Sequence, residues 1–325
     1  MKSATMKQAK DFKLEKGKAT RAAFGDALVE LGETNPNVIA LDADLSKSTH
    51  THDFGKKFPE RFIECGIAEA DMVAIAAGLA TTGKIPFAAS FSAFLLNKGF
   101  EQMRVTAAFP DVNVKFVGTH SGISIGEDGP SQMSIEDLSL ACSLAGFTVI
   151  SPADEVSMRA LVKAAAEHVG PVFIRAGRPS VPIVHEADQA FEIGKAVTLV
   201  DGSDVTLIAT GLMVAEAIKA AVALEGEGIS ARVVDMHTIK PLDRDAIAAA
   251  AKETGAIVVA EEHLVDGGLG VRVAQVVGET HPAVMEFVGI QNTYAESATP
   301  DQLLDKYGLR AGPVAAAAKK AVGRK

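Results

Sequence analysis

The chain alternates short apolar runs with segments of helical period, and this alternation restricts its fold more than any other feature of the sequence. Apolar runs that predict buried strands lie at 38–44, 86–91 and 113–120. Segments that predict helices lie at 21–32, 69–80 and 155–168. Strands separated by helices of this length are joined by right-handed crossovers. The pattern therefore predicts an α/β fold with a mainly parallel, doubly wound sheet.

The alternation of apolar runs and helical segments is interrupted around residues 181–191, where VPIVHEADQAFEIG carries mixed charges and shows no clear hydrophobic period. A second α/β series follows, with the strand-like runs VTLIAT, SARVVDM, AIVVAEE and VMEFVGI and with helices expected at 214–224, 244–253 and 271–279. We therefore expect two doubly wound domains, at 18–185 and 186–325, after an N-terminal extension at residues 1–17.

Composition and charge exclude several classes of protein. The 325 residues include 32 Lys and Arg against 41 Asp and Glu, a net charge of −9, so we expect no nucleic-acid partner. Two cysteines, Cys65 and Cys142, are too few for a disulfide framework or a structural zinc site. The longest apolar run, near 72–80, is too short to span a membrane. The sequence predicts a soluble, cytoplasmic protein with no membrane partner.

The segment ECGIAEADM places one carboxylate, Glu69, where a strand ends and an Ala-rich helix begins. An acidic residue in the first turn of a helix often does no more than interact favourably with the helix dipole. The helix that follows, however, is apolar on nearly every face, which predicts that Glu69 is shielded from water beside it. A buried acid that can keep or share a proton is a candidate catalytic residue.

Three phenylalanines, Phe91, Phe94 and Phe100, lie close together in SFSAFLLNKGFEQMR, in a chain with only 5% aromatic residues. Core packing is the ordinary explanation for any phenylalanine. On the residues alone, this cluster is assigned to the core.

A polar segment at residues 120–137 leaves the third predicted strand and is predicted to be a loop. Loops held on a rigid sheet are typical sites of function. The glycines of the segment alone indicate no more than turns. Their combination with His120, Glu127 and Asp128 makes the loop a stronger candidate for binding.

Two arginines are candidate ligands for an anion: Arg21 on the first helix and Arg175 at the end of PVFIRAG. An arginine at the end of a strand more often forms a surface ion pair. In an acidic protein, two arginines at one edge of a sheet would nevertheless suit a phosphate group, which guanidinium binds in bidentate fashion.

The order of motifs in the chain resembles the C-terminal half of transketolases, and in particular the separately encoded C-terminal subunit of split transketolases. The motifs are LDADLSKST, ECGIAEADM, PFAASFSAF, GTHSGISIGEDGP, VISPAD, PVFIRAGR and HTIKPLD, and the resemblance runs from about residue 18 to the end. It implies a pyrimidine-binding domain followed by a transketolase C-terminal domain, with thiamine diphosphate as cofactor.

The resemblance also implies roles in cofactor binding. Glu69 matches the family glutamate that hydrogen-bonds N1′ of the aminopyrimidine and promotes its imino tautomer. Phe91 and Phe94 fall where the family stacks aromatic rings on the aminopyrimidine. Asp44 and Leu45 match the segment that lines the cofactor near the subunit interface.

For the substrate, the resemblance implies two groups of residues. His120 and Asp128 match residues that contact sugar hydroxyls and orient the acceptor. Arg21, Ser48 and Arg175 resemble the family's sugar-phosphate site. We therefore expect a two-carbon ketol unit to be transferred from a ketose phosphate to an aldose phosphate.

One position departs from the family pattern. Where the family usually has GEDGPTHQP, this chain has GEDGPSQMS, so that Gln132 replaces a histidine that touches the substrate and Met133 replaces the next residue. A neutral amide can hydrogen-bond a sugar hydroxyl but cannot shuttle a proton. The choice of donor and acceptor sugar is therefore left open.

The chain contains no Gly-Asp-Gly, the motif through which the family binds the Mg²⁺ diphosphate. We therefore expect the Mg²⁺ ligands on a partner, an N-terminal subunit that carries the diphosphate-binding domain, in an α₂β₂ assembly that is active only as a complex. Three alternatives stay open: the β subunit of a 2-oxo acid dehydrogenase E1 component, a 1-deoxyxylulose-5-phosphate synthase, and a non-catalytic regulatory or scaffold subunit.

Overall fold

Seven strands form the first sheet in the computed structural model, which describes residues 7–325. In spatial order they are β12 (Thr238–Lys240), β6 (Thr148–Ile150), β7 (Val172–Arg175), β5 (Lys115–Thr119), β4 (Ile85–Phe91), β2 (Val38–Asp42) and β3 (Phe62–Glu64). All pairings are parallel except that of β12 with β6. The predicted mainly parallel α/β sheet is confirmed.

Helices connect these strands, and the helices predicted at 21–32, 69–80 and 155–168 are among them. They are α1 (Thr20–Thr34), α2 (Ser46–Thr49), α3 (Thr51–Lys57), α4 (Glu69–Ala80), α5 (Ser92–Gln102), α6 (Asp137–Ser143) and α7 (Glu155–Glu167). The start of α7 is fixed by Asp154, whose side chain accepts the Ser157 N–H at 2.8 Å, a typical N-cap. Because α4 has few polar residues, it packs against both the sheet and the neighbouring helix α5.

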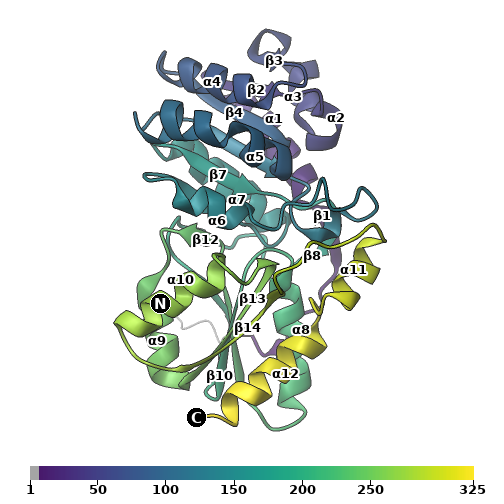
Figure 1. The fold of residues 1–325 in the computed structure, drawn as a ribbon, viewed down its shortest axis with the longest axis vertical. Helices are drawn as coiled ribbons and strands as arrows, with labels where there is room; N and C mark the ends of the chain where they lie inside the picture. The colour runs from purple at the N-terminus through teal and green to yellow at the C-terminus, as the bar shows by residue number, and fades with distance from the viewer. Residues whose placement is uncertain (1–6) are drawn as a thin grey trace.

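A second sheet of five strands follows, in the order β14 (Val284–Ile290), β13 (Ala256–Leu264), β10 (Val205–Ala209), β11 (Ala231–Asp235) and β9 (Val197–Val200). Its helices are α8 (Met213–Glu225), α9 (Arg244–Thr254), α10 (Leu269–Glu279), α11 (Pro300–Lys306) and α12 (Ala311–Val322). Only β9 pairs in antiparallel fashion. Figure 1 shows the two units one above the other, with β12 at their junction.

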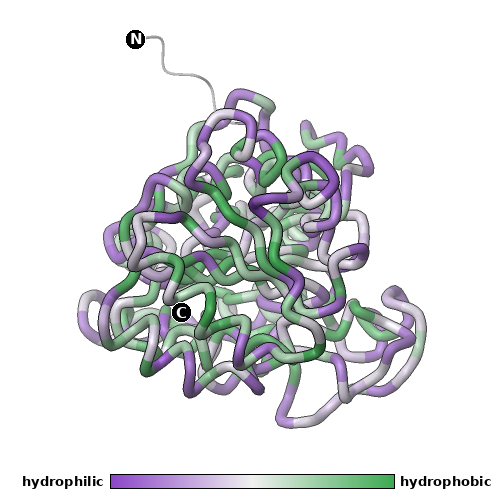
Figure 2. The backbone as a smooth tube through the Cα atoms, turned by 90° about the horizontal axis from the view of Figure 1, so that it is seen from above, coloured by the Kyte–Doolittle hydropathy of each residue, from purple (hydrophilic) through white to green (hydrophobic). Residues whose placement is uncertain are grey.

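The strand β12 joins the two units, since it follows β11 in the chain but completes the edge of the first sheet. Apolar side chains from both units also share continuous cores, and Figure 2 shows hydrophobic segments running through the interior. Sharing a sheet and a core makes a large, apolar contact between the domains, which favours a fixed arrangement.

The N-terminal segment is more than an extension. Lys16–Ala19 forms β1, which pairs in antiparallel fashion with β8 (Ser180–Pro182). Ala9, in the short helix Ala9–Asp11, is 4% exposed and belongs to the core of the second unit. Residues 8–19 therefore pack along both units, and residues 1–6 of the predicted extension lie outside the described residues.

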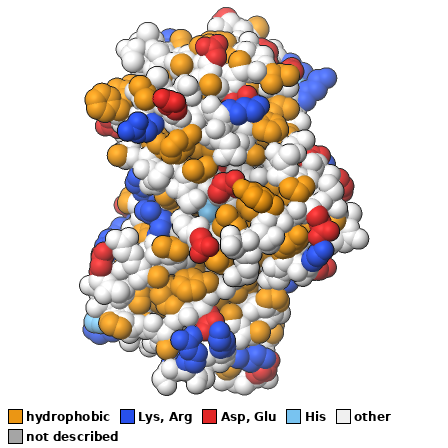
Figure 3. All heavy atoms as spheres, viewed as in Figure 1, with side chains coloured by type: hydrophobic (Ala, Val, Ile, Leu, Met, Phe, Trp, Pro, Cys, Tyr) orange, Lys and Arg blue, Asp and Glu red, His pale blue; other side chains and the backbone are white. Residues whose placement is uncertain are grey.

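The surface carries mixed charge. On the face drawn in Figure 3, acidic and basic side chains are interspersed. None of the helices within residues 7–325 combines the length and the apolar character needed to cross a bilayer. Cys142 is buried, whereas Cys65 is only partly buried, and both are free thiols.

Candidate active site

The predicted site residues come from the carboxyl ends of neighbouring parallel strands. Phe91 ends β4, His120 follows β5, and Glu69 begins the helix after β3. Asp44, Leu45 and Ser48 follow β2. Since β3, β2, β4 and β5 are adjacent in the sheet, these segments meet along one edge, the usual location of binding sites in open α/β sheets.

Glu69 is buried, as its apolar helix predicts: the residue is only 3% exposed. Its two carboxylate oxygens accept hydrogen bonds from Lys98 Nζ at 3.0 and 3.2 Å. Lys98 lies on α5, and its side chain is 49% exposed. The buried acid therefore has a cation as partner that reaches it from the solvent side.

Aromatic rings lie beside this ion pair. Phe91 and Phe94 stack with their centroids 5.6 Å apart, and Phe91 stacks on His120 at 3.8 Å. The ammonium of Lys98 lies 4.6 Å from the centroid of the Phe94 ring. A flat ring placed on Phe94 at this point would meet the Glu69 carboxylate at its edge.

His120 is a neutral polar group in this site. It is 3% exposed, and its Nδ1 lies 2.9 Å from Thr119 Oγ1. Burial lowers the pKa of His120 to about 3, and the charges of Arg21 and Arg178 act in the same direction. At neutral pH the imidazole is therefore uncharged and can both donate and accept a hydrogen bond.

Two arginines gather next to His120, and one of them was not predicted. Arg21 Nη1 donates to the backbone oxygen of Ser48 at 2.5 Å, and Arg21 Nε donates to that of Arg178 at 3.5 Å. Burial, with a contribution from Arg178, lowers the pKa of Arg21. Arg178 in turn donates to the backbone oxygen of Ile125 and lies 3.2 Å from Glu127 Oε2. The two guanidinium groups form a positive site.

The structure does not bring Arg175, which was predicted to bind phosphate, to this positive site. Arg175 is 5% exposed, and its Nε donates to Asp137 Oδ2 at 2.8 Å. Its Nη2 donates to the backbone oxygens of Glu262 and Ser134 at 2.8 and 3.3 Å. These contacts commit Arg175 to a buried network between the domains. Arg178, three residues later, occupies the place expected of it.

Asp44 and Leu45 lie in a segment shaped by a buried carboxylate. Asp42 accepts the Leu45 N–H at 2.6 Å and the hydroxyl protons of Thr49 and Thr51 at 2.6 and 2.9 Å. Burial raises the pKa of Asp42 to about 6, although these hydrogen bonds oppose the shift. Asp44 is exposed and has a φ of 61°. Asp42 therefore fixes the turn that presents Asp44 and Leu45.

The loop at 120–137 has a polar and an apolar side. Asp128 is exposed and Gln132 is half-buried, so both are placed for contact with a ligand. Met133 is 3% exposed and packs in the interdomain core with Ile125. Met133 therefore does not face a substrate, and Gln132 is the residue of this pair that can.

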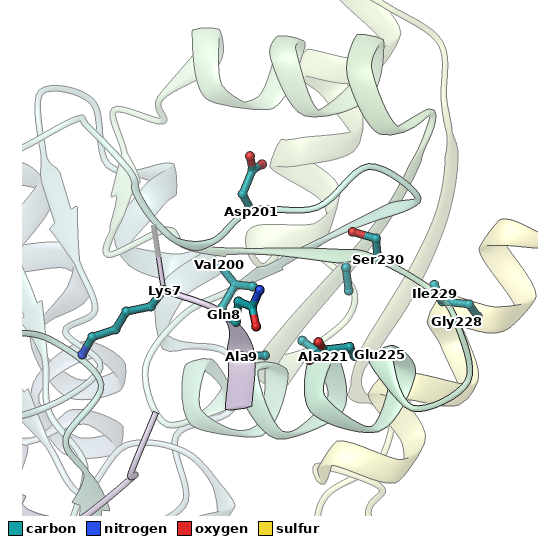
Figure 4. Close-up of a pocket in the computed structure, with 11 residues that line it drawn as sticks. Lys7, Gln8, Ala9, Val200, Asp201, Ala221, Glu225, Gly228, Ile229 and Ser230 are labelled. Carbon is teal, nitrogen blue, oxygen red and sulfur yellow. The ribbon is translucent and has the colours of Figure 1, made fainter. Parts of the chain in front are cut away.

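The described residues 7–325 contain no group of three or more His, Cys, Asp or Glu side chains arranged to hold a metal ion. A cavity of about 570 Å³ lies elsewhere, between the N-terminal segment and the second unit. Figure 4 shows Gln8 and Ala9 in its wall, beside Val200 and the helix that carries Glu225. None of the predicted site residues lines this cavity.

Sequence reasoning missed Lys98 and Arg178. A signal was present for each: Lys98 follows Phe94 by four residues, which places both on one face of α5. Arg178 follows Arg175 in the same strand-end segment, IRAGR. The pattern left open which of the two arginines turns toward the site.

Comparison with known proteins gives a consistent result over nearly the whole chain. The family model described as "Transketolase, pyrimidine binding domain" matches residues 16–184, and "Transketolase, C-terminal domain" matches residues 194–314. A Methanocaldococcus jannaschii protein named "Putative transketolase C-terminal section" is 43% identical over 296 residues, 90% of this chain and 92% of that protein.

Two further relatives also match over nearly the full length of both chains. A Clostridium protein named "6-deoxy-6-sulfo-D-fructose transketolase subunit SqwH" is 42% identical over 306 residues, 94% of this chain and 95% of that protein. The solved structure titled "Split gene transketolase, inactive beta4 tetramer" superposes with a TM-score of 0.89 at 51% identity, covering 94% of this chain and 99% of that one. The resemblance seen in the motifs is confirmed: this chain belongs to the transketolase family, with a pyrimidine-binding domain followed by a transketolase C-terminal domain.

Proposed function

We propose that this chain is the C-terminal subunit of a cytoplasmic two-chain transketolase, which transfers a two-carbon ketol unit from a ketose phosphate to an aldose phosphate. The observation that carries the proposal is the position of Glu69. The residue is 3% exposed, and its carboxylate accepts a hydrogen bond from Lys98 Nζ at 3.0 Å, which in turn lies 4.6 Å from the centroid of Phe94 in the Phe91–Phe94 stack. A carboxylate buried beside stacked aromatic rings suits a planar heterocycle that needs both a stacking surface and a hydrogen-bond partner.

The residues present fit the aminopyrimidine of thiamine diphosphate. Phe94 would contact its face, and Glu69 would hold a proton between its carboxylate and the ring nitrogen. Lys98 now lies where these two contacts meet, so its ammonium moves outward when the ring binds. When bound, thiamine diphosphate supplies the carbon nucleophile of the reaction. The protein contributes orientation, exclusion of water and the proton held by Glu69.

The positive site suits the anionic group of the sugar. Arg21 and Arg178 supply two guanidinium groups, which pair well with a phosphate. Arg178 exchanges Glu127 for this group when the sugar binds. His120 is uncharged, stacks on Phe91 and is close enough to Arg21 and Arg178 for their charges to lower its pKa, so it is placed to hydrogen-bond a sugar hydroxyl. The name of the Clostridium relative gives a sulfonated ketose, another sugar with a terminal anion, which agrees with such a site.

A partner subunit completes the site in this proposal. The relatives of equal length are named as a section, a subunit and a split-gene product. Ile67, two residues before Glu69, is 76% exposed, as expected of a residue that a partner covers. The diphosphate and Mg²⁺ are held by that N-terminal subunit, in an α₂β₂ complex. Oxygen ligands of the kind Mg²⁺ prefers would come from its diphosphate-binding domain.

Reconstitution tests the proposal. The purified chain is mixed with an N-terminal transketolase subunit from the same source, thiamine diphosphate and Mg²⁺, and ketol transfer from D-xylulose 5-phosphate to D-ribose 5-phosphate is measured. We expect transfer in the complete mixture and none when either chain or the cofactor is left out. Transfer by this chain alone, or none in a mixture that forms the complex, would contradict the proposal.

A further inference from the structure

A carboxylate of the second domain enters the loop that carries the predicted substrate residues. Glu262 lies on β13, is 3% exposed, and accepts the Ser124 N–H through Oε1 at 2.6 Å. Gly122 makes room for it, because a Cβ at that position would lie 2.2 Å from the carboxyl carbon of Glu262. Gly122 also has a φ of 79°, a conformation that favours glycine. The backbone of the loop is thus wrapped closely around this one side chain.

The backbone of Glu262 is held as firmly as its side chain. Its carbonyl oxygen accepts the Arg175 Nη2–H at 2.8 Å, and Arg175 Nε donates to Asp137 at 2.8 Å. Burial raises the pKa of Glu262 to about 7; Arg175 on β7 opposes this shift, and Asp137 on α6 adds to it. Arg175, which was expected to bind phosphate, instead helps to fix the group that holds the loop.

The rest of the loop is anchored in the same domain. Ile123, Ile125 and Ile135 pack into the core formed with residues of the second sheet. The Leu264 N–H donates to the Ile135 backbone oxygen at 2.8 Å. A Cβ on Gly129 would lie 2.5 Å from Ser297 Oγ, so this part of the loop lies directly on the second domain. The position of the polar residues on the outer side of the loop therefore depends on the second domain.

We propose that Glu262 is a positioning residue for the sugar substrate: by accepting the Ser124 N–H and packing against Gly122, it fixes the loop that presents His120, Asp128 and Gln132. The inference rests on the proposed function, and it assigns a task in that function to the C-terminal domain. Small displacements of substrate-binding groups have large effects on reactivity, because the reacting atoms must be held in a narrow range of geometry.

The neighbouring residue provides a matched control. Glu261 is also buried, at 2% exposed, but its oxygens accept the Leu269 and Gly270 N–H groups at 2.7 and 2.8 Å, at the start of α10. Both glutamates lie on β13, and the side chain of each accepts hydrogen bonds from backbone N–H groups of another segment. Only Glu262 binds the substrate loop, so replacement of Glu261 measures the effect of losing a buried carboxylate in this domain without releasing the loop.

The first measurement is made on the isolated chain by hydrogen–deuterium exchange. Glu262→Ala removes the acceptor of the Ser124 N–H, whereas Glu262→Gln keeps an acceptor oxygen and copies the uncharged form. We expect exchange at Ser124 to be about ten-fold faster in Glu262→Ala, intermediate in Glu262→Gln, and unchanged in Glu261→Ala. Unchanged exchange at Ser124 in both Glu262 variants would overturn the anchoring role.

The second measurement is made on the complex with the N-terminal subunit, with D-xylulose 5-phosphate and D-ribose 5-phosphate as probes. We expect Glu262→Ala to raise KM for the sugars about ten-fold and Glu262→Gln about three-fold, with thiamine diphosphate affinity changed less than two-fold. Glu261→Ala leaves both constants near wild type. Equal sugar KM values for the Glu262 and Glu261 variants would overturn the inference.

Loss of transfer in the wild-type complex would instead reject the proposed function, and exchange at Ser124 would still decide whether Glu262 anchors the loop. If Glu262→Ala does not fold, Glu262→Gln decides both measurements.

Discussion

Lys98 Nζ lies 3.0 and 3.2 Å from the two carboxylate oxygens of Glu69 and 4.6 Å from the centroid of Phe94. The ammonium therefore occupies the point at which a heterocycle stacked on Phe94 would bond to Glu69. Binding of the aminopyrimidine must break this ion pair. The pair also gives a buried carboxylate a counter-ion while the ring is absent.

Replacement of Lys98 by Met should make the cofactor bind more tightly. A half-exposed ion pair contributes about 1 kcal/mol, so its loss should lower the apparent Kd for thiamine diphosphate in the complex about five-fold. The isolated Lys98→Met chain should also melt at a lower temperature, because Glu69 is left buried without a partner. Lys319→Met is the control, since Lys319 contacts both oxygens of Glu227 at 3.0 and 3.1 Å in the second domain. A Kd equal to that of the control would show that Lys98 does not compete with the cofactor.

Replacement of Arg178 should affect substrate binding, whereas replacement of Arg175 should mainly affect stability. Arg178→Ala should raise KM for sugar phosphates about ten-fold or more, with a smaller change in kcat, because a charged contact to the substrate is lost. Arg175→Ala should lower the free energy of unfolding by about 3–5 kcal/mol, because it leaves Asp137 buried without its cation. Steady-state kinetics and denaturant unfolding separate the two effects. A raised sugar KM in a stable Arg175→Ala protein, with Arg178→Ala unaffected, would reverse the assignment.

The contact of His185 with two aspartates should make stability depend on pH. His185 Nδ1 lies 3.1 Å from Asp154 in the first domain, and Nε2 lies 3.1 Å from Asp235 in the second. Although burial acts to lower it, the hydrogen bond to Asp154 and the negative charge of Asp235 raise the pKa of His185 to about 9. A raised histidine pKa stabilises the fold fully below the unfolded value of about 6.5, and this contribution is lost as the pH rises through 9.

The contribution of His185 to the unfolding free energy should therefore fall between pH 6.5 and 9, by up to about 1.4 kcal/mol per pH unit. Chemical unfolding at several pH values measures this slope. It should be reduced in His185→Gln and retained in the control His281→Gln, since His281 is exposed. Equal slopes in the two variants would mean that His185 is not the titrating group.

From the sequence it was possible to place the parts of the site that depend on where each strand ends and on the composition of the helix that follows it. The strands end at Asp42, Glu64, Phe91 and Thr119, so the residues just beyond them had to share one edge of a parallel sheet. The apolar character of α4 was enough to predict that Glu69 is buried.

The parts that were missed depend on contacts between distant segments. Arg175 turns away from the site because Asp137, 38 residues earlier in the chain, receives its guanidinium. The loop is held by Glu262, 138 residues after Ser124. The strand β12 leaves its own domain to pair with β6. No periodicity or motif encodes such pairings, because they arise only when segments far apart in the chain pack together.

The central claim is that the buried carboxylate of Glu69 acts on the cofactor, and Glu69→Gln tests it most directly. The substitution keeps the size of the side chain and removes the acid. In the complex with the N-terminal subunit at saturating thiamine diphosphate, kcat for ketol transfer should fall at least about 100-fold. Asp71→Asn, at an exposed acid on the same helix, should stay near wild type. A Glu69→Gln complex that keeps near-normal kcat would contradict the account.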